Sequence, residues 1–358
     1  MLQVRGMRLW LLLLLAVLCS VPSASAAGGG LTATIDTDRD FLSGTESAVV
    51  RVTLRNESAE DMYVPYWQTA VRGVHGNLFD VQLNGKPVAY VGRLYKWGKP
   101  QAEDYVRIPA GREVTAEVDL SRHYDLSRTG EHSIRYRVPV QDSFRGMGTA
   151  VDFVRGLRDL ESNTLYVSIE RDALGRFVQE LRQNAGEAVA PGFVSCTSTR
   201  QSTLQTALGN AESISLKARD YLNNLPSASR PTDTPYRTWF GEYTSSRYST
   251  VQSHFVSIYS AFNTKPVTFY CDCTSSAYAY VYSNQPYGIH LCNAFWNAPN
   301  LGIDSKAGTL VHEMSHFSVV AGTSDHAYGT SACQRLATSN PKKAINNADS
   351  HEYFAETR

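Results

Sequence analysis

Apolar and polar residues alternate along the first half of the chain, from residue 31 to about residue 170. The alternation is clearest in residues 50–54 and 134–138, where every second side chain is apolar. Turn signals such as Asn84-Gly85 separate the apolar runs. A period of two is typical of strands with one buried face. About seven short strands at this spacing predict an all-β, antiparallel sandwich of immunoglobulin type over residues 27–170.

The pattern changes after residue 170. Residues 171–193 begin as a short amphipathic helix and end rich in Gly, Ala and Pro, which predicts a linker or processing region. Beyond it, residues 202–225 and 246–262 carry apolar side chains at helical spacing. Short Val- and Tyr-rich runs between the later cysteines indicate a few strands. We therefore predict a multidomain chain whose second domain, residues 194–358, is mostly helical α+β.

The first 26 residues have the pattern of a secretory signal peptide. Arg5 and Arg8 precede an apolar run over residues 9–18, and an A-x-A cleavage site follows at residues 24–26. The alternative is a membrane anchor, but the run is shorter than the about 20 residues that a spanning helix needs. We expect a secreted protein that has no membrane association after cleavage.

Composition narrows the function. The chain has 34 basic and 34 acidic residues, so its formal net charge is zero and gives no support for nucleic-acid binding. Cys19 lies in the predicted signal, and an odd number of cysteines remains for disulfides in an exported protein. Cys271 and Cys273 are separated by one residue, and the alternative to disulfides for such a C-x-C pair is a metal site. The remaining cysteines are Cys196, Cys271, Cys273, Cys292 and Cys333.

Candidate chemistry gathers in residues 308–329. His312 and His316 are four residues apart, so on a helix they share a face and can hold one metal ion. Glu313 follows the first histidine, where a zinc hydrolase places the general base for a water molecule. Zinc accepts such nitrogen ligands, and a catalytic site keeps three protein ligands beside the water. The alternative is a polar helix face with no metal.

The third ligand must come from beyond the helix, which we expect to end at residues 321–323, where the chain turns back. Asp325 is the first carboxylate to follow, and His326 is its rival. Tyr328 could donate a hydrogen bond to a developing oxyanion.

The stretch "GTLVHEMSHF…AGTSDHAYG" closely resembles the aspzincin metallopeptidases, the group of deuterolysin and peptidyl-Lys metalloendopeptidase. The resemblance covers roughly residues 196–358 and implies a zincin-type fold with one zinc ion per chain. It implies that the zinc ligands are His312, His316 and Asp325, the catalytic base Glu313 and the transition-state stabiliser Tyr328. It extends through residues 236–251, 269–282, 290–299 and 346–357.

The resemblance also implies disulfides Cys196–Cys271 and Cys273–Cys292, which would leave Cys333 unpaired. Asp349 and Glu352 are three residues apart and match positions that form an acidic pocket in the Lys-specific branch. Such a pocket would favour the ammonium of lysine over the planar guanidinium of arginine. The alternative is a solvated helix surface.

These features predict a secreted zinc endopeptidase, made as a zymogen, that cuts proteins or peptides on the amino side of lysine. The β-rich half would then be its propeptide. Residues 171–195 contain no lysine, so we predict that another protease makes the maturation cut there, or that self-cleavage is slow. The alternatives are a broad deuterolysin-like peptidase and a catalytically silent binding or adhesion protein.

Overall fold

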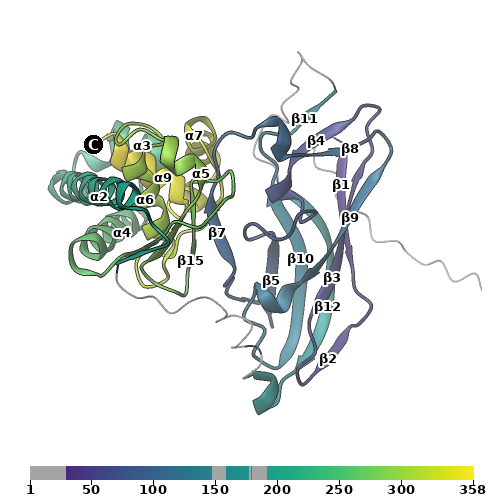
Figure 1. Ribbon diagram of the computed structural model, residues 1–358. Helices are drawn as coiled ribbons and strands as arrows, with labels where there is room; N and C mark the ends of the chain where they lie inside the picture. Colours follow the sequence, from purple (N-terminus) through teal and green to yellow (C-terminus); the bar gives the residue numbers. More distant parts are fainter. Residues whose placement is uncertain (1–29, 147–158, 177–178, 180–191) are drawn as a thin grey trace, which may run out of the picture.

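The computed structural model describes residues 30–146, 159–176, 179 and 192–358. The predicted signal peptide and most of the predicted linker lie outside these residues. Figure 1 shows a β-rich N-terminal half beside a helical C-terminal half. This division was predicted from the change of hydrophobic period.

Alternating burial along several N-terminal strands, including β1, β3, β5 and β10, confirms that one face of each packs into a core. Strand β10, for example, alternates buried and partly buried residues from His132 to Val138. The strands are β1 (Leu31–Asp36), β2 (Phe41–Ser43), β3 (Val49–Asn56), β4 (Met62–Pro65), β5 (Phe79–Leu83), β6 (Lys86–Pro87), β7 (Arg93–Lys96), β8 (Tyr105–Ile108), β9 (Glu113–Asp119), β10 (Gly130–Pro139), β11 (Phe144–Arg145) and β12 (Asp159–Glu170).

Most of these strands form sheets within their own half. The sheet orders are β1-β3-β9, β2-β12-β10-β5-β6 and β11-β4-β8, and their inward side chains share one apolar cluster. The predicted turn at Asn84-Gly85 joins β5 to β6, with both residues at positive φ as a tight hairpin requires. The pairing is antiparallel as expected, except that β2 and β12 run parallel.

The C-terminal half packs helices around the buried helix α6. Its predicted helices over residues 202–225 and 246–262 correspond to α2 and α4, whereas α3 and α7 were not predicted. The helices are α2 (Ser198–Asn224), α3 (Thr234–Phe240), α4 (Ser245–Thr264), α5 (Asn293–Asn297), α6 (Lys306–His316), α7 (Thr330–Ser339), α8 (Pro341–Ala344) and α9 (Ala348–Glu356). None of the helices in the described part of the chain is long and apolar enough to cross a membrane.

Strand β7 belongs to the first half of the chain but pairs with the second. The C-terminal sheet has the order β13-β14-β16-β15-β7, in which the strands other than β7 are β13 (Gly192–Val194), β14 (Thr268–Tyr270), β15 (Ala279–Tyr282) and β16 (Gly288–Leu291). Strand β7 lies antiparallel to β15 as the outermost strand (Figure 1). The sequence analysis missed it, because Arg-Leu-Tyr-Lys is too short to show a period.

The expected end of the helix that carries His312 and His316 was wrong. Helix α6 ends at His316 instead of residues 321–323, because the amides of Val320, Ala321 and Gly322 all bond to the carbonyl of Phe317 in a tight turn. The C-terminal tail forms two helices, α8 and α9. Between them the chain extends at Asn347, whose side chain binds the loop before α7.

Disulfides join Cys196 to Cys271 and Cys273 to Cys292, which are the pairs that the resemblance implies. The first connects the start of the helical half to the end of β14, and the second connects that region to the start of α5. Cys333 is a buried free thiol on α7. The second bond lies near β7, because Cys292 packs in the same apolar cluster as Tyr95 and Trp97.

Candidate active site

Helix α6 positions two imidazoles in the centre of the C-terminal half. Ser305 caps the helix by accepting a hydrogen bond from the amide of Gly308, and every residue of α6 is buried. His312 and His316 lie one turn apart, with their Nε2 atoms separated by 3.1 Å. The spacing predicted from the sequence is therefore realised on a helix that has little freedom to move.

The loop after α6 brings Asp325 to the imidazoles. Its Oδ1 atom lies 3.3 Å from Nε2 of His312 and 3.4 Å from Nε2 of His316. Asn347 holds this loop in place, because its Oδ1 atom accepts hydrogen bonds from the amides of His326 and Ala327. Among the described residues, the rival His326 is not part of this group of potential ligands.

The outer nitrogens of both rings are already engaged. Nδ1 of His316 donates a hydrogen bond to the carbonyl oxygen of Thr323 at 2.9 Å. Nδ1 of His312 lies 2.7 Å from a carboxylate oxygen of Asp349. A neutral imidazole has one N–H, so hydrogen at Nδ1 leaves a lone pair at each Nε2. These two lone pairs and the carboxylate of Asp325 therefore face one another.

This donor set fits zinc. Three lone-pair atoms in mutual contact repel one another unless a cation lies between them. Tetrahedral zinc with bonds of about 2.0–2.2 Å separates its ligands by about 3.3 Å, close to the 3.1–3.4 Å between these three atoms. Two nitrogens and one oxygen also leave a fourth position for a water or substrate oxygen.

Glu313 lies next to the imidazoles and away from solvent. Its side chain is fully buried, and neither carboxylate oxygen has a hydrogen-bond partner among the described residues. Burial raises the pKa of Glu313 to about 7. A buried carboxyl group that titrates near neutrality can both accept and return a proton.

Tyr328 points at the backbone of β7. Its hydroxyl donates a hydrogen bond of 2.8 Å to the carbonyl oxygen of Tyr95, the residue before Lys96. The amide of Tyr328 is itself held by the side chain of Gln141 from the N-terminal half. The phenol therefore binds the carbonyl of an Xaa-Lys peptide bond.

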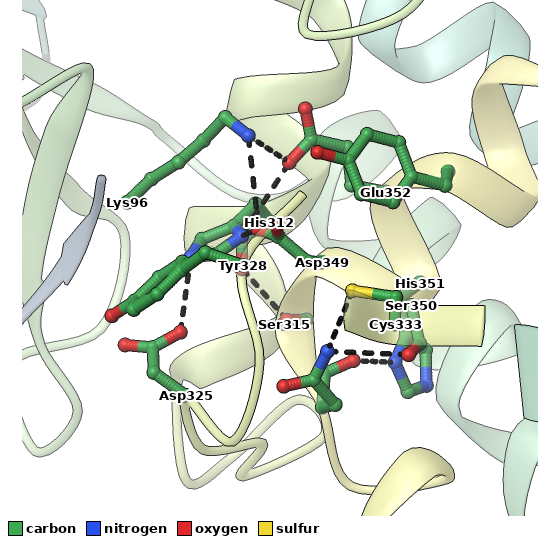
Figure 2. Close-up of polar contacts among 12 residues, drawn as sticks. Lys96, His312, Ser315, Asp325, Tyr328, Cys333, Asp349, Ser350, His351 and Glu352 are labelled. Carbon is green, nitrogen blue, oxygen red and sulfur yellow. Dashed lines mark hydrogen bonds and ion pairs between the residues drawn. The ribbon is translucent and has the colours of Figure 1, made fainter. Parts of the chain in front are cut away.

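Asp349 and Glu352 lie on the buried face of α9, so the alternative of a solvated helix surface is wrong. Figure 2 shows Lys96 reaching from β7 into this acidic pocket. Its ammonium lies 2.7 Å from Glu352, 3.2 Å from Asp304 and 3.7 Å from Asp349. Asp349 is closer to His312 than to the ammonium, so it contacts both the imidazole pair and the pocket.

Lys96 is charged although it is fully buried. Burial acts to lower its pKa, but the carboxylates of Asp349, Glu352 and Asp304 outweigh that effect and hold the pKa well above its usual value. The ring of Tyr278 lies 5.0 Å from the ammonium and supplies a further favourable face.

Sequence reasoning missed Lys96, Tyr95 and Asp304. Lys96 and Tyr95 have no sequence signal, because nothing in a short strand separates this lysine from others in the chain. Asp304 lies far from Asp349 and Glu352 in the sequence, so no local spacing links it to them. Ser305 makes the capping bond, and Asp304 instead lies at a φ of 54° with its carboxylate in the pocket.

Two imidazoles and a carboxylate around one point, with a buried glutamate beside them, define the class of zinc metallopeptidases with an H-E-x-x-H helix. A family model described as lysine-specific metallo-endopeptidase matches residues 226–356. The chain belongs to this family, the aspzincins, and is a zinc metalloendopeptidase.

Curated relatives agree over most of the chain. An extracellular protease of Aeromonas hydrophila is 37% identical over 87% of this chain and 88% of its own. A peptidyl-Lys metalloendopeptidase of Armillaria mellea is 32% identical over 95% of both chains. Another protein of that name, from Pleurotus ostreatus, is 51% identical over 46% of this chain and 95% of its own.

Proposed function

We propose that this protein is a secreted endopeptidase, made as a zymogen, that cuts peptide bonds on the amino side of lysine. The observation that carries the proposal is the position of Lys96. Its ammonium fills the acidic pocket while the preceding carbonyl, that of Tyr95, accepts a hydrogen bond from Tyr328. A substrate with lysine after the scissile bond would place the same groups in the same positions.

The proposed roles follow from the geometry. His312, His316 and Asp325 would hold zinc, which when bound supplies Lewis-acid polarisation of a carbonyl and a water molecule. Glu313 takes the proton of the attacking water and delivers it to the departing lysine amine. The hydroxyl of Tyr328 stabilises the negative charge that develops on the carbonyl oxygen.

Lysine selectivity has a physical basis in the pocket. Glu352 and Asp349 are buried and cannot be solvated, so their charges require a cation. The compact ammonium of Lys96 contacts both carboxylates and Asp304 at once. A guanidinium is larger and planar, so arginine would fit this arrangement less well. The pocket supports cleavage before lysine over a broad deuterolysin-like specificity.

Strand β7 blocks the same site, which supports an inhibitory role for the β-rich half. Trp67 and Trp97 from this half stack at 4.2 Å and pack with Ala277 and Cys292 beside the pocket. A chain that must enter this edge has to displace β7. We propose an immunoglobulin-like propeptide over residues 27–170, a processing region at 171–193 and a catalytic domain at 194–358.

The test is a digest of one defined protein by the processed enzyme, with every released peptide identified by mass spectrometry. New amino termini should begin with lysine, activity should disappear with a chelator, and added zinc should restore it. Cuts without regard to lysine would indicate a broad-specificity peptidase. The absence of any cut would favour a silent binding protein.

A further inference from the structure

Strand β7 shows how a substrate would lie on both sides of the scissile bond. The position of Lys96 and the bond from Tyr328 to the carbonyl of Tyr95 identify Tyr95–Lys96 as the equivalent of the cut bond. The antiparallel register then places Tyr95 opposite Tyr280 and Arg93 opposite Tyr282. Arg93 is the third residue on the amino side of that bond.

The side chain of Arg93 has a defined set of contacts on β15. Its Nε atom donates a hydrogen bond of 2.7 Å to the hydroxyl of Tyr282. Its guanidinium carbon lies 4.8 Å from the ring centroid of Tyr280 and 5.7 Å from that of Tyr282. Within the described residues, Arg93 makes no ion pair with a carboxylate. These contacts therefore differ in kind from those of the lysine pocket.

The two tyrosine rings are supported by the catalytic half itself. The ring of Tyr280 stacks on His290 at 4.3 Å and 6°, and His290 stacks in turn on Tyr270 at 4.2 Å. Tyr282 meets Tyr280 edge to face at 5.9 Å. Because β14, β15 and β16 carry this stack, it does not depend on β7 and would remain when β7 has left.

We infer that Tyr280 and Tyr282 form a second specificity subsite, which binds a basic residue three positions before the cut, and arginine in preference to lysine. The inference rests on the proposed function. A planar guanidinium can stack on one ring while donating to the phenol of the other, whereas an ammonium is a point charge with fewer such contacts. Successive side chains of an extended substrate point to opposite faces. The residue equivalent to Arg93 would then contact the two tyrosine rings on one face, and the lysine equivalent to Lys96 would contact the carboxylates on the other.

The experiment compares peptides of the series Xaa-Leu-Tyr-Lys-Trp, with Arg, Lys, Ala or Glu at the first position, as substrates of the processed enzyme. We expect kcat/KM to fall in that order, with arginine about fivefold better than alanine because the site is partly exposed to solvent. All four peptides should be cut before lysine.

Tyr282→Phe removes the phenol and should reduce the ratio of kcat/KM for the Arg peptide to kcat/KM for the Ala peptide. Tyr259→Phe is the matched control, because its ring lies under Arg219 on a different surface of the same half. Equal rates for Arg and Ala peptides, all cut before lysine, would overturn the subsite and leave the proposed function intact. Failure to cut before lysine would overturn both.

Discussion

The two halves of the molecule place charged side chains in different environments. In the β-rich half, ion pairs such as Arg51–Asp36 and Arg55–Glu113 join side chains that are at least 37% exposed. In the helical half, Glu313 and Glu352 are fully buried in the protein core. Exposed pairs contribute little to stability, whereas a buried carboxylate is costly unless a cation neutralises it.

This difference in burial indicates that the candidate active site lies in the helical half. The buried carboxylates of the helical half gather in two adjacent groups that share His312. One group fits a zinc ion, and the other holds the ammonium of Lys96. The N-terminal half thus supplies the cation at the site that we propose for the lysine of a substrate.

The largest effect is expected from Glu313→Gln, which removes the base but keeps the shape of the side chain. We expect kcat to fall by about 10²–10⁴-fold, measured with a peptide that contains one lysine. The zinc content and the melting temperature should stay near those of the parent. Undiminished turnover would show that the base lies elsewhere, and lost zinc would mean that Glu313 helps to hold the metal.

Lys96→Ala tests whether the buried cation keeps the precursor latent. Its loss leaves buried carboxylates unpaired, which costs about 3–5 kcal/mol for such a site and weakens the hold of β7. The uncut precursor, verified by intact mass, should then hydrolyse short lysine peptides. Lys99→Ala, at an exposed lysine near the end of the same segment, is the control. An intact Lys96→Ala precursor that stays inactive would contradict the proposed blockage.

Glu352→Gln and Asp349→Asn should separate the pocket from the metal ligands. Glu352 is the nearest carboxylate to the ammonium but lies 3.4 Å from Nδ1 of His312, farther than Asp349. Its neutral variant should therefore lose about tenfold in the preference for lysine, with a smaller loss of zinc affinity than Asp349→Asn gives. Asp349 contacts His312, so its variant should also weaken zinc binding by about 10–100-fold. Zinc titration and peptide kinetics measure the two effects. Equal changes in zinc affinity and in lysine preference for the two variants would contradict the separate roles of Glu352 and Asp349.

The smallest effect concerns the pair Lys343–Asp159, which joins the two halves away from the site at 3.0 Å. Burial acts to raise the pKa of Asp159, but Lys343 and Arg137 outweigh it and keep the pKa below its usual value. The stabilisation is therefore present above the unfolded pKa of about 3.9 and lost as pH falls through the lower folded value.

Lys343→Ala should thus lower the free energy of unfolding by about 1 kcal/mol or less at pH 6 and by less at pH 3. Urea unfolding at the two pH values measures this difference. Arg51→Ala, at an exposed pair of the β-rich half, should give no measurable change. A larger loss of unfolding free energy at pH 3 than at pH 6 would contradict the expected direction of the pH dependence.

Local patterns in the sequence predicted much of the architecture. The period of two in β3 and β10 and the helical spacing in α2 and α4 were sufficient, because these elements are long enough to show their buried face. Helix α6 was predicted with an incorrect end, since the turn after His316 depends on the carbonyl of Phe317. The short elements β7 and α3 carry too few residues for a period.

The sequence by itself determined the groups that lie within one or two turns of each other. His312, Glu313 and His316 share a helix, and so do Asp349 and Glu352, because helical geometry brings residues three and four apart onto one face. Resemblance to a family added the disulfide pairs and the choice of Asp325.

Only the tertiary structure decided which distant groups meet at the pocket. Lys96 reaches Glu352 and Asp304 because β7 leaves the sheets of its own half and pairs with β15. No local rule predicts that pairing, since the backbone of an edge strand accepts any extended segment and the choice of partner depends on packing across the whole chain. The buried ammonium is stable only because folding brings these carboxylates around it.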